Sequence, residues 1–329
     1  MSDPAITARN LSKTFSSVKK QPGIAGSLRA LVSREKTHME AVKSVSFDIA
    51  PGELVGFLGP NGAGKTTTLK MLTGILHPTS GEARVLGYKP FDRKPELLRQ
   101  IALVMGNKNQ LWWDLPAWDS FVVLRELYGV DQKHFDSRMD RLLTDLQLTD
   151  KVNTQVRKMS LGERMKCELI AALLHGPKVI FLDEPTIGLD LVSQKRIRDF
   201  LKELNRDEGS TMILTSHYMQ DVQELCERVV VIDHGKIIFD GTLDSLMMRY
   251  SDKRILRLRF SEEVPAESLA KYGELNDTED ESVAITVKRS DTSKVTAAVL
   301  ANLPVADISI EEVSVEEVIR NLFAEAPPA

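Results

Sequence analysis

Short runs of aliphatic and β-branched residues alternate with stretches of helical apolar spacing between residue 41 and about residue 240. The runs are SVSFDI, ELVGFLG, IALVMG, KVIFLDE, TMILTSH and RVVVID. Strands that alternate with helices in this way favour a mostly parallel sheet covered by helices. We therefore predict an α/β domain over residues 1–241.

After residue 241 the pattern changes to that of a smaller, more acidic module. Strand-like RILRLRF, VAITVKR and ADISIEEVS accompany a helical TSKVTAAVLANL, and a last helix is expected around VEEVIRNLF. This order predicts a small α+β, ferredoxin-like domain over residues 242–329. We expect it to have a regulatory or dimerisation role.

Residues 16–40 interrupt the early strand pattern. Pro22 and Gly23 are followed by Leu28, Leu31 and Val32 at helical spacing, with basic residues between them. The segment predicts a loop that carries a short basic amphipathic helix.

Composition narrows the possible classes of protein. The chain has 329 residues, 42% of them apolar, and a formal net charge of -4, so charge gives no argument for a nucleic-acid partner. The two cysteines, Cys167 and Cys226, lack metal-ligand spacing and are expected to be core thiols of a reduced, cytosolic protein. No apolar run is long enough to cross a bilayer, and the first ten residues do not resemble a signal peptide.

The stretch ELVGFLGPNGAGKTTTLKML places a GxxxxGK[ST] motif between a strand and a helix. Glycines at these positions let backbone amides face phosphate oxygens, and the helix N-terminus adds its dipole. Lys65 would neutralise the β and γ phosphates, and the Thr66 hydroxyl would coordinate Mg²⁺. The motif predicts binding of ATP or GTP. The residues expected to contact the nucleotide are Gly59, Asn61, Gly62, Ala63, Gly64, Lys65, Thr66 and Thr67.

Two adjacent carboxylates end the run KVIFLDEP, where ligands bind in parallel sheets. Asp183 would bind Mg²⁺ together with Thr66, and Glu184 would polarise the water that attacks the γ-phosphate. The alternative for this pair is a solvated strand end followed by a turn at EPT.

The stretch RKMSLGERMKCELI begins a helical pattern with Ser160 and with Glu163 three residues later. This spacing predicts a capping box, in which each residue satisfies a free amide at the helix start. Taken alone, the stretch has only this structural role.

Four motifs in order, GPNGAGKTT, SLGE, FLDEPTIGLD and TSHYMQDV, resemble the ATP-binding subunit of an ABC transporter over residues 5 to about 240. The resemblance implies a P-loop ABC ATPase domain with a mostly parallel core sheet, an antiparallel β subdomain and a helical subdomain at about residues 110–175. It further implies roles for individual residues. These are signature contacts in trans by Ser160, Leu161, Gly162 and Glu163, a D-loop at Gly188 to Asp190, a switch histidine at His217, and an adenine-stacking ring at Phe15, which could instead be a core residue.

The chain departs from the family pattern in two places. Leu161 and Glu163 stand where glycine and glutamine are usual in the signature motif. In VMGNKNQLWWDL, the equivalent of the Q-loop glutamine is either Asn107 or Gln110. The tryptophans that follow, Trp112, Trp113 and Trp118, either face a partner or are packed.

We therefore expect an ATPase subunit that binds ATP and Mg²⁺, dimerises with a second copy of itself, and drives a separately encoded transmembrane permease from the cytoplasmic face of the membrane. The single nucleotide-binding half, the insertion after Phe15 and the small acidic C-terminal module together resemble the ATPases of the ABC-2 group, which implies export of a drug, lipid or polysaccharide. The alternative is a soluble ABC ATPase of DNA repair or of the ribosome, which would require a coiled-coil insertion or a tandem domain. A GTPase is disfavoured because the chain has no NKxD motif.

Overall fold

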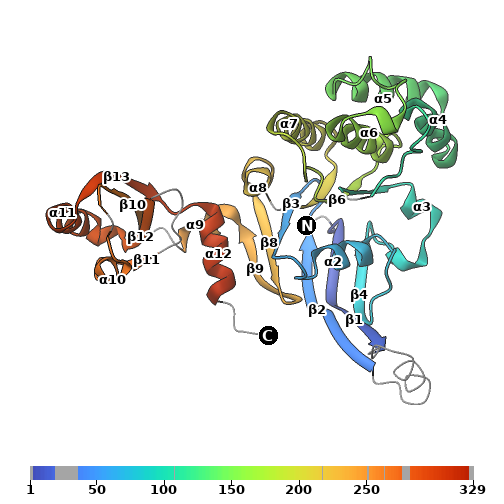
Figure 1. Cartoon of the computed structure of the whole chain (residues 1–329). Coiled ribbons are helices and arrows are strands. Elements are labelled where there is room, and N and C mark those ends of the chain that lie inside the picture. Colours follow the sequence, from blue (N-terminus) through green and yellow to red (C-terminus); the bar gives the residue numbers. More distant parts are fainter. Residues whose placement is uncertain are drawn as a thin grey trace, which may run out of the picture. The chain divides into compact units, whose positions relative to one another are not determined.

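The computed structural model of the chain describes residues 3–18, 36–106, 108–216, 218–249, 252–262, 264–275 and 282–325. The chain forms two compact units, which divide between Asp240 and Gly241 (Figure 1). Each unit has its own sheets and its own buried core.

A six-stranded sheet organises the first unit, in the order β5-β6-β7-β3-β8-β9. Its neighbours from β5 to β8 pair in parallel. Strands β3, β6 and β7 are buried along their whole length, which explains their continuous apolar runs. The strands are β3 Leu54–Leu58, β5 Ile101–Met105, β6 Val179–Asp183, β7 Thr211–Thr215, β8 Arg228–Asp233 and β9 Lys236–Thr242.

An antiparallel sheet lies beside it, with β2 (Lys36–Ile49), β1 (Ile6–Val18) and β4 (Ser80–Val85) in the order β2-β1-β4. Strands β1 and β2 pair as far as Val18 and Lys36. The loop predicted over residues 16–40 is therefore shorter, because backbone pairing extends both strands into it. The helix predicted around Leu28 lies outside the described residues.

Three helices of the first unit lie together. Figure 1 shows α4, α5 and α6 gathered at one end of the unit, apart from β1, β2 and β4, as the predicted helical subdomain requires. Their ends follow local chemistry: α4 stops at Gly129 with φ 67°, and the Asp131 side chain caps α5. The helices are α2 Lys65–Leu72, α3 Pro95–Leu98, α4 Ala117–Tyr128, α5 Gln132–Asp145, α6 Leu161–Leu173, α7 Leu191–Glu208 and α8 Met219–Leu225.

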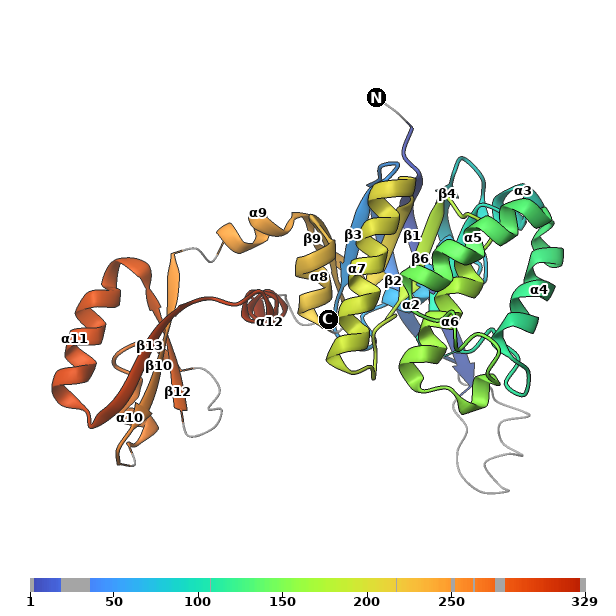
Figure 2. The same cartoon turned by 90° about the horizontal axis from the view of Figure 1, so that it is seen from above.

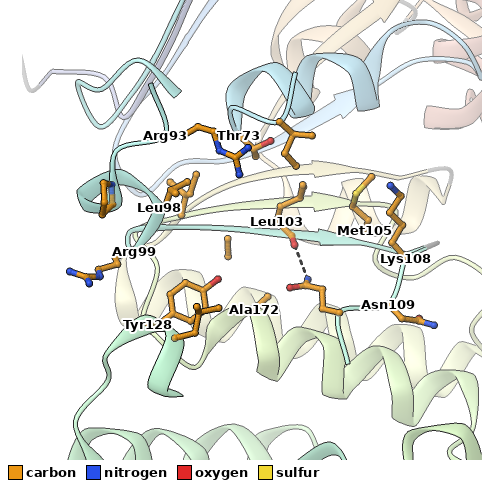
Figure 3. Close-up of a pocket in the computed structure, with 16 residues that line it drawn as sticks. Thr73, Arg93, Leu98, Arg99, Leu103, Met105, Lys108, Asn109, Tyr128 and Ala172 are labelled. Carbon is orange, nitrogen blue, oxygen red and sulfur yellow. Dashed lines mark hydrogen bonds between the residues drawn. The ribbon is translucent and has the colours of Figure 1, made fainter. Parts of the chain in front are cut away.

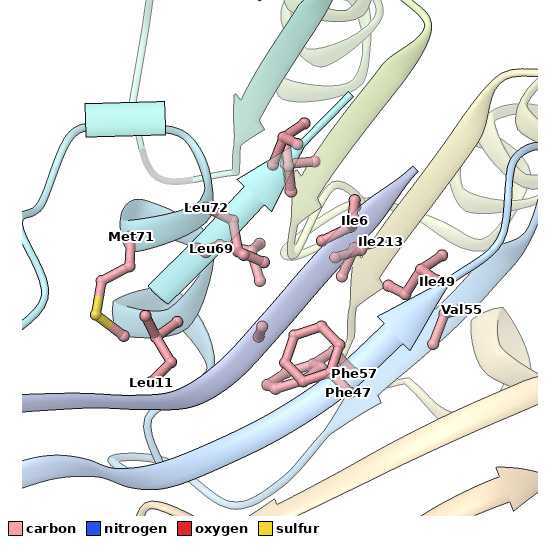
Figure 4. Close-up of a cluster of buried hydrophobic side chains, with 14 of the residues drawn as sticks. Ile6, Leu11, Phe47, Ile49, Val55, Phe57, Leu69, Met71, Leu72 and Ile213 are labelled. Carbon is pink, nitrogen blue, oxygen red and sulfur yellow. The ribbon is translucent and has the colours of Figure 1, made fainter. Parts of the chain in front are cut away.

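The main core joins both sheets to helix α2 (Figure 4). Phe47 of β2 and Phe57 of β3 meet with ring centroids 5.7 Å apart. Leu69 and Leu72 of α2 pack into the same cluster. Helix α2 is thereby fixed against the strands, and so is the loop that precedes it.

The second unit has the order β10-α10-β11-β12-α11-β13, with an antiparallel sheet in the order β11-β12-β10-β13. This is the ferredoxin-like arrangement, and the predicted fold class is confirmed for both units. Helices α9 and α12 complete the unit (Figure 2). The elements are α9 Leu243–Met248, β10 Lys253–Phe260, α10 Ala266–Leu269, β11 Glu274–Leu275, β12 Ser282–Lys288, α11 Thr292–Asn302, β13 Val305–Glu312 and α12 Val315–Glu325.

Candidate nucleotide site

In the loop between β3 and α2, backbone carbonyl groups of other segments leave no room for a side chain at two glycines. A Cβ on Gly59 would lie 2.2 Å from the Ile232 carbonyl oxygen, and one on Gly64, at φ 110°, would lie 2.5 Å from the Ala41 carbonyl oxygen. At Gly62, with φ 81°, a Cβ would meet nothing within 4 Å. The loop is therefore packed on the protein side and open where a ligand would lie.

Lys65 is buried at the start of α2. Its ammonium donates to the carbonyl oxygens of Gly59, at 2.6 Å, and of Pro60, at 3.1 Å. Burial lowers the pKa of Lys65, while the charges of Glu184 and Asp183 oppose the shift. The cation thus lies inside the loop, where phosphate oxygens could replace the two carbonyl acceptors.

The next residue, Thr66, reaches the end of β6. Its hydroxyl donates to the two carboxylate oxygens of Asp183 at 2.9 and 3.1 Å, and the Thr215 hydroxyl donates to the same group at 2.8 Å. Glu184 follows in the left-handed region, at φ 57°, and its amide donates to the Thr215 carbonyl oxygen at 3.0 Å. The chain turns at Glu184, so the Glu184 side chain is half-buried, whereas that of Asp183 is buried.

The predicted capping box is confirmed at the start of α6. The Glu163 amide donates to the Ser160 hydroxyl oxygen at 3.2 Å, and the Ser160 amide donates to a carboxylate oxygen of Glu163 at 2.9 Å. The hydrogen bond from the Ser160 amide lowers the pKa of Glu163, and Lys151 lies 3.5 Å from its carboxylate. The end of the helix therefore keeps its shape through its own contacts.

The predicted signature motif lies beside the predicted D-loop of the same chain. A Cβ on Gly162 would be 2.6 Å from the Ser193 hydroxyl oxygen, and one on Gly188 would be 3.2 Å from Leu161 Cδ2. Asp190 caps α7, because its carboxylate accepts from the amide and hydroxyl of Ser193 at 2.9 and 2.8 Å. Two helix N-termini are thus presented together at the surface.

Phe15 is not the core residue that was one alternative. It is 42% exposed, and Lys13 Nζ lies 5.4 Å from its ring centroid. Phe15 pairs with Met39, which is two residues from Ala41, the neighbour of Gly64 in the P-loop.

Two predicted site residues, Asn107 and His217, lie outside the described residues. The other Q-loop candidate, Gln110, donates its side-chain amide to the Leu103 carbonyl oxygen at 3.0 Å.

The three predicted tryptophans differ in how far they are exposed. Trp112 and Trp113 are exposed, whereas Trp118 is half-buried and meets the Phe135 ring edge-on with centroids 5.8 Å apart.

A buried ion pair that the sequence did not reveal supports the turn after β6. Asp221 of α8 accepts from the Arg198 guanidinium at 3.0 Å and from the hydroxyls of Thr186 and Ser216 at 2.5 and 2.6 Å. Thr186 follows the carboxylate pair, and Ser216 precedes the predicted switch histidine. Thr186 lies in FLDEPTIGLD, Ser216 and Asp221 lie in TSHYMQDV, and Arg198 lies outside the four motifs, so no local pattern connects the four residues.

A cavity of about 610 Å³ opens between α3, β5 and the helices α4 and α6 (Figure 3). Aliphatic side chains such as Leu98, Leu103 and Met105 line it, and Arg93, Arg99 and Lys108 add positive charge. The Gln110 side chain also lines this cavity. The segment after β5, which holds the Q-loop candidate Gln110, therefore forms one of its walls.

A strand, a glycine-rich loop and a helix, with a carboxylate pair at the end of β6 in the same parallel sheet, define a P-loop nucleotide hydrolase. The family model "ABC transporter" matches residues 42–187, and "EvrA-like ABC transporter, C-terminal domain" matches residues 252–311. The ABC transporter ATP-binding protein NatA of Bacillus subtilis (strain 168) is 36% identical over 212 residues, which are 64% of this chain and 86% of that protein.

The linearmycin resistance ATP-binding protein LnrL of the same organism is 31% identical over 280 residues, which are 84% of this chain and 89% of that protein. A solved structure titled as the dimeric post-hydrolysis state of the ATP-binding cassette MJ0796 with ADP and Pi has a TM-score of 0.60 at 24% identity. It matches 72% of this chain and 98% of that one, and shows the same fold.

The chain belongs to the ABC transporter family, as an ATP-binding subunit that hydrolyses ATP to power a membrane permease. The predicted function is confirmed. Across the described ranges, every helix is too short or too polar to span a membrane.

Proposed function

We propose that two copies of the chain hold two ATP molecules head to tail, each between the P-loop of one protomer and the signature motif of the other. The observation that carries this proposal is the exposure of the signature end of α6 and the D-loop end of α7 side by side. Leu191 and Val192 are 75% and 80% exposed there, and Leu161 is 40% exposed. An apolar edge around two helix N-termini fits a partner that brings phosphate.

Mg²⁺ fits the contact between Thr66 and Asp183. A hydroxyl and a carboxylate within 2.9 Å of each other supply hard oxygen ligands, which Mg²⁺ combines with substrate phosphates. Bound there, the ion would offset negative charge on the phosphates. Glu184 would accept a proton from the attacking water, and His217 would contact the γ-phosphate.

The permease would dock at the cavity and the exposed residues beside it. Trp112 lies in the loop after β5, and Leu127 both lines the cavity and is exposed. Apolar walls with a cationic rim suit a permease segment that carries apolar and acidic side chains. This contact would hold the subunit at the cytoplasmic face of the membrane.

Export of a drug, lipid or polysaccharide is the proposed direction and cargo class. The relative LnrL is named for resistance to linearmycin, which supports export. The second domain, residues 242–329, would have a regulatory or dimerisation role.

The test of the head-to-tail site mixes two inactive variants, Lys65→Ala and Ser160→Arg. In a mixed dimer both lesions fall in one site, and the other site is intact. Random pairing makes about half of the dimers mixed, so activity should return to roughly a quarter of wild type. If each signature motif served its own protomer, every site would carry a lesion and mixing would restore nothing.

A further inference from the structure

Glu168, near the middle of α6, has a buried carboxylate that the ATPase motifs do not include. It is 3% exposed. Its oxygens accept from the backbone amides of Gln110, at 2.9 and 3.0 Å, and of Leu111, at 3.3 Å. A buried charge is costly unless hydrogen bonds compensate for it, so this carboxylate is kept in place by those two amides.

The loop depends on this contact more than the helix does. Helix α6 has its own capping box and a long buried face. Residues 108–116 contain no strand or helix, and within the described part of the chain the hydrogen bonds of the Gln110 and Leu111 amides end on Glu168. Without this acceptor, the amide of the buried Leu111 would lose its partner.

A second link joins the same two elements. The Arg164 guanidinium, one turn before Glu168 on α6, lies 4.9 Å from the ring centroid of Trp113. Burial raises the pKa of Glu168, while the two amides and the charge of Arg164 oppose that shift. The two amides and Arg164 thus offset part of the cost of burying the carboxylate.

The other end of the loop is tied to the ATP site. Met105 pairs with Asp183 across β5 and β6, and the Gly106 amide donates to the Asp183 carbonyl oxygen at 2.9 Å. Both Q-loop candidates therefore lie in a short segment anchored to Asp183 at one end and to Glu168 at the other.

From this geometry we infer that Glu168 is a positioning residue, which holds the loop of residues 108–113 in place for ATP hydrolysis at the P-loop of its own protomer. The inference rests on the proposed head-to-tail dimer. Loss of the Glu168 carboxylate should lower kcat without weakening ATP binding, because Lys65 and the P-loop glycines keep their contacts.

The first test measures steady-state ATPase activity of Glu168→Ala and Glu168→Gln. We expect kcat to fall about tenfold or more in Glu168→Ala, with KM for ATP within about twofold of wild type. Glu168→Gln keeps the shape and one acceptor oxygen, so its loss should be smaller. Cys167→Ala is the matched control. It alters the neighbouring buried residue, whose thiol donates a hydrogen bond to the Met159 sulfur at 3.7 Å. It should retain kcat.

Amide hydrogen exchange gives a readout that needs no activity. In wild type the Gln110 and Leu111 amides should exchange more slowly than that of Asn109. Glu168→Ala should remove that protection, whereas Cys167→Ala should leave it. Unprotected amides in wild type would overturn the inference even if no Glu168 variant folds.

Mixing experiments separate the inference from the function on which it rests. Glu168→Ala mixed with Ser160→Arg should regain up to roughly a quarter of wild-type activity, and mixed with Lys65→Ala it should regain none. The reverse pattern would mean that Glu168 acts through the signature motif and would overturn the inference. Failure of the Lys65→Ala and Ser160→Arg pair would instead overturn the head-to-tail dimer.

Discussion

The P-loop and the signature motif, which we propose to meet the same ATP molecule from two protomers, are stabilised in different ways. The P-loop is shaped by distant neighbours: Ile232 and Ala41 leave no room for a side chain on Gly59 or Gly64. The signature end of α6 is shaped by hydrogen bonds within the four residues from Ser160 to Glu163.

This difference suits the proposed roles. A loop that depends on the core is fixed as long as the domain is folded. A helix end that satisfies its own amides can stay exposed and still be ready to meet a partner repeatedly. Variants of the two regions should therefore fail differently.

Glu184→Gln should produce the largest effect and should leave both regions intact. The amide keeps the shape of the side chain but cannot accept the proton, so kcat should fall by about 10² to 10⁴. ATP should still bind, and the proposed dimer should accumulate on size-exclusion chromatography with ATP. Turnover near that of wild type would show that another group acts as the base.

Alanine at Gly64 and at Gly162 compares the two regions directly. Gly64→Ala combines a positive φ with a contact of 2.5 Å to a backbone carbonyl oxygen, and should lower the free energy of unfolding by more than about 3 kcal/mol. At Gly162 the added Cβ would meet the Ser193 side chain, its hydroxyl oxygen at 2.6 Å and its Cβ at 3.2 Å, and not a backbone atom. A shift of that side chain, with loss of its hydrogen bond to Asp190, would relieve the contact, and alanine favours the helix. Thermal unfolding should therefore show a large loss for Gly64→Ala and a change below about 1 kcal/mol for Gly162→Ala.

His175, just beyond the other end of α6, should make stability depend on pH. Its ring stacks on Tyr128 with centroids 3.9 Å apart, its Nε2 lies 3.2 Å from the Ile101 carbonyl oxygen, and burial lowers its pKa to about 4. The unfolded chain binds this proton near pH 6.5, so stability should fall as pH drops from about 6.5 to about 4. The loss is on the order of 3 kcal/mol.

The measurement is the free energy of urea unfolding against pH for wild type and His175→Phe. The free energy of unfolding of wild type should fall relative to that of His175→Phe as pH drops through this window, since phenylalanine does not titrate. Parallel curves would show that His175 is not the group responsible.

Ser160→Ala should have the smallest effect on the isolated subunit. Loss of the cap should cost about 1 kcal/mol in the free energy of unfolding. ATP affinity of the subunit, measured by calorimetry, should not change, because the signature motif is proposed to serve the partner. Weaker binding by the isolated subunit would place Ser160 in its own site.

The sequence predicted features whose chemistry is local. The spacing of Gly59, Gly64 and Lys65 between a strand and a helix fixes a P-loop, and Ser160 with Glu163 fixes a capping box. The ferredoxin-like order of the second unit also followed from its alternating patterns.

Features that join distant segments were missed. Glu168 is 58 residues from Gln110, and it occupies a helical position like any other. Arg198 and Asp221 form their ion pair across two helices, and either residue alone would be expected on the surface. The strand extensions to Val18 and from Lys36 were missed because each strand is stabilised by the other, and neither segment alone is strongly strand-like.

The capping box uses only part of the hydrogen-bonding capacity of the Ser160 hydroxyl. Its hydroxyl oxygen accepts from the Glu163 amide, which uses a lone pair and leaves the hydroxyl hydrogen uncommitted by that bond. One side chain can thus close the helix with its oxygen and donate its hydrogen to an anion outside. Ending the helix and recognising a phosphate therefore do not compete for the same atom, so the motif can be kept for either purpose without losing the other.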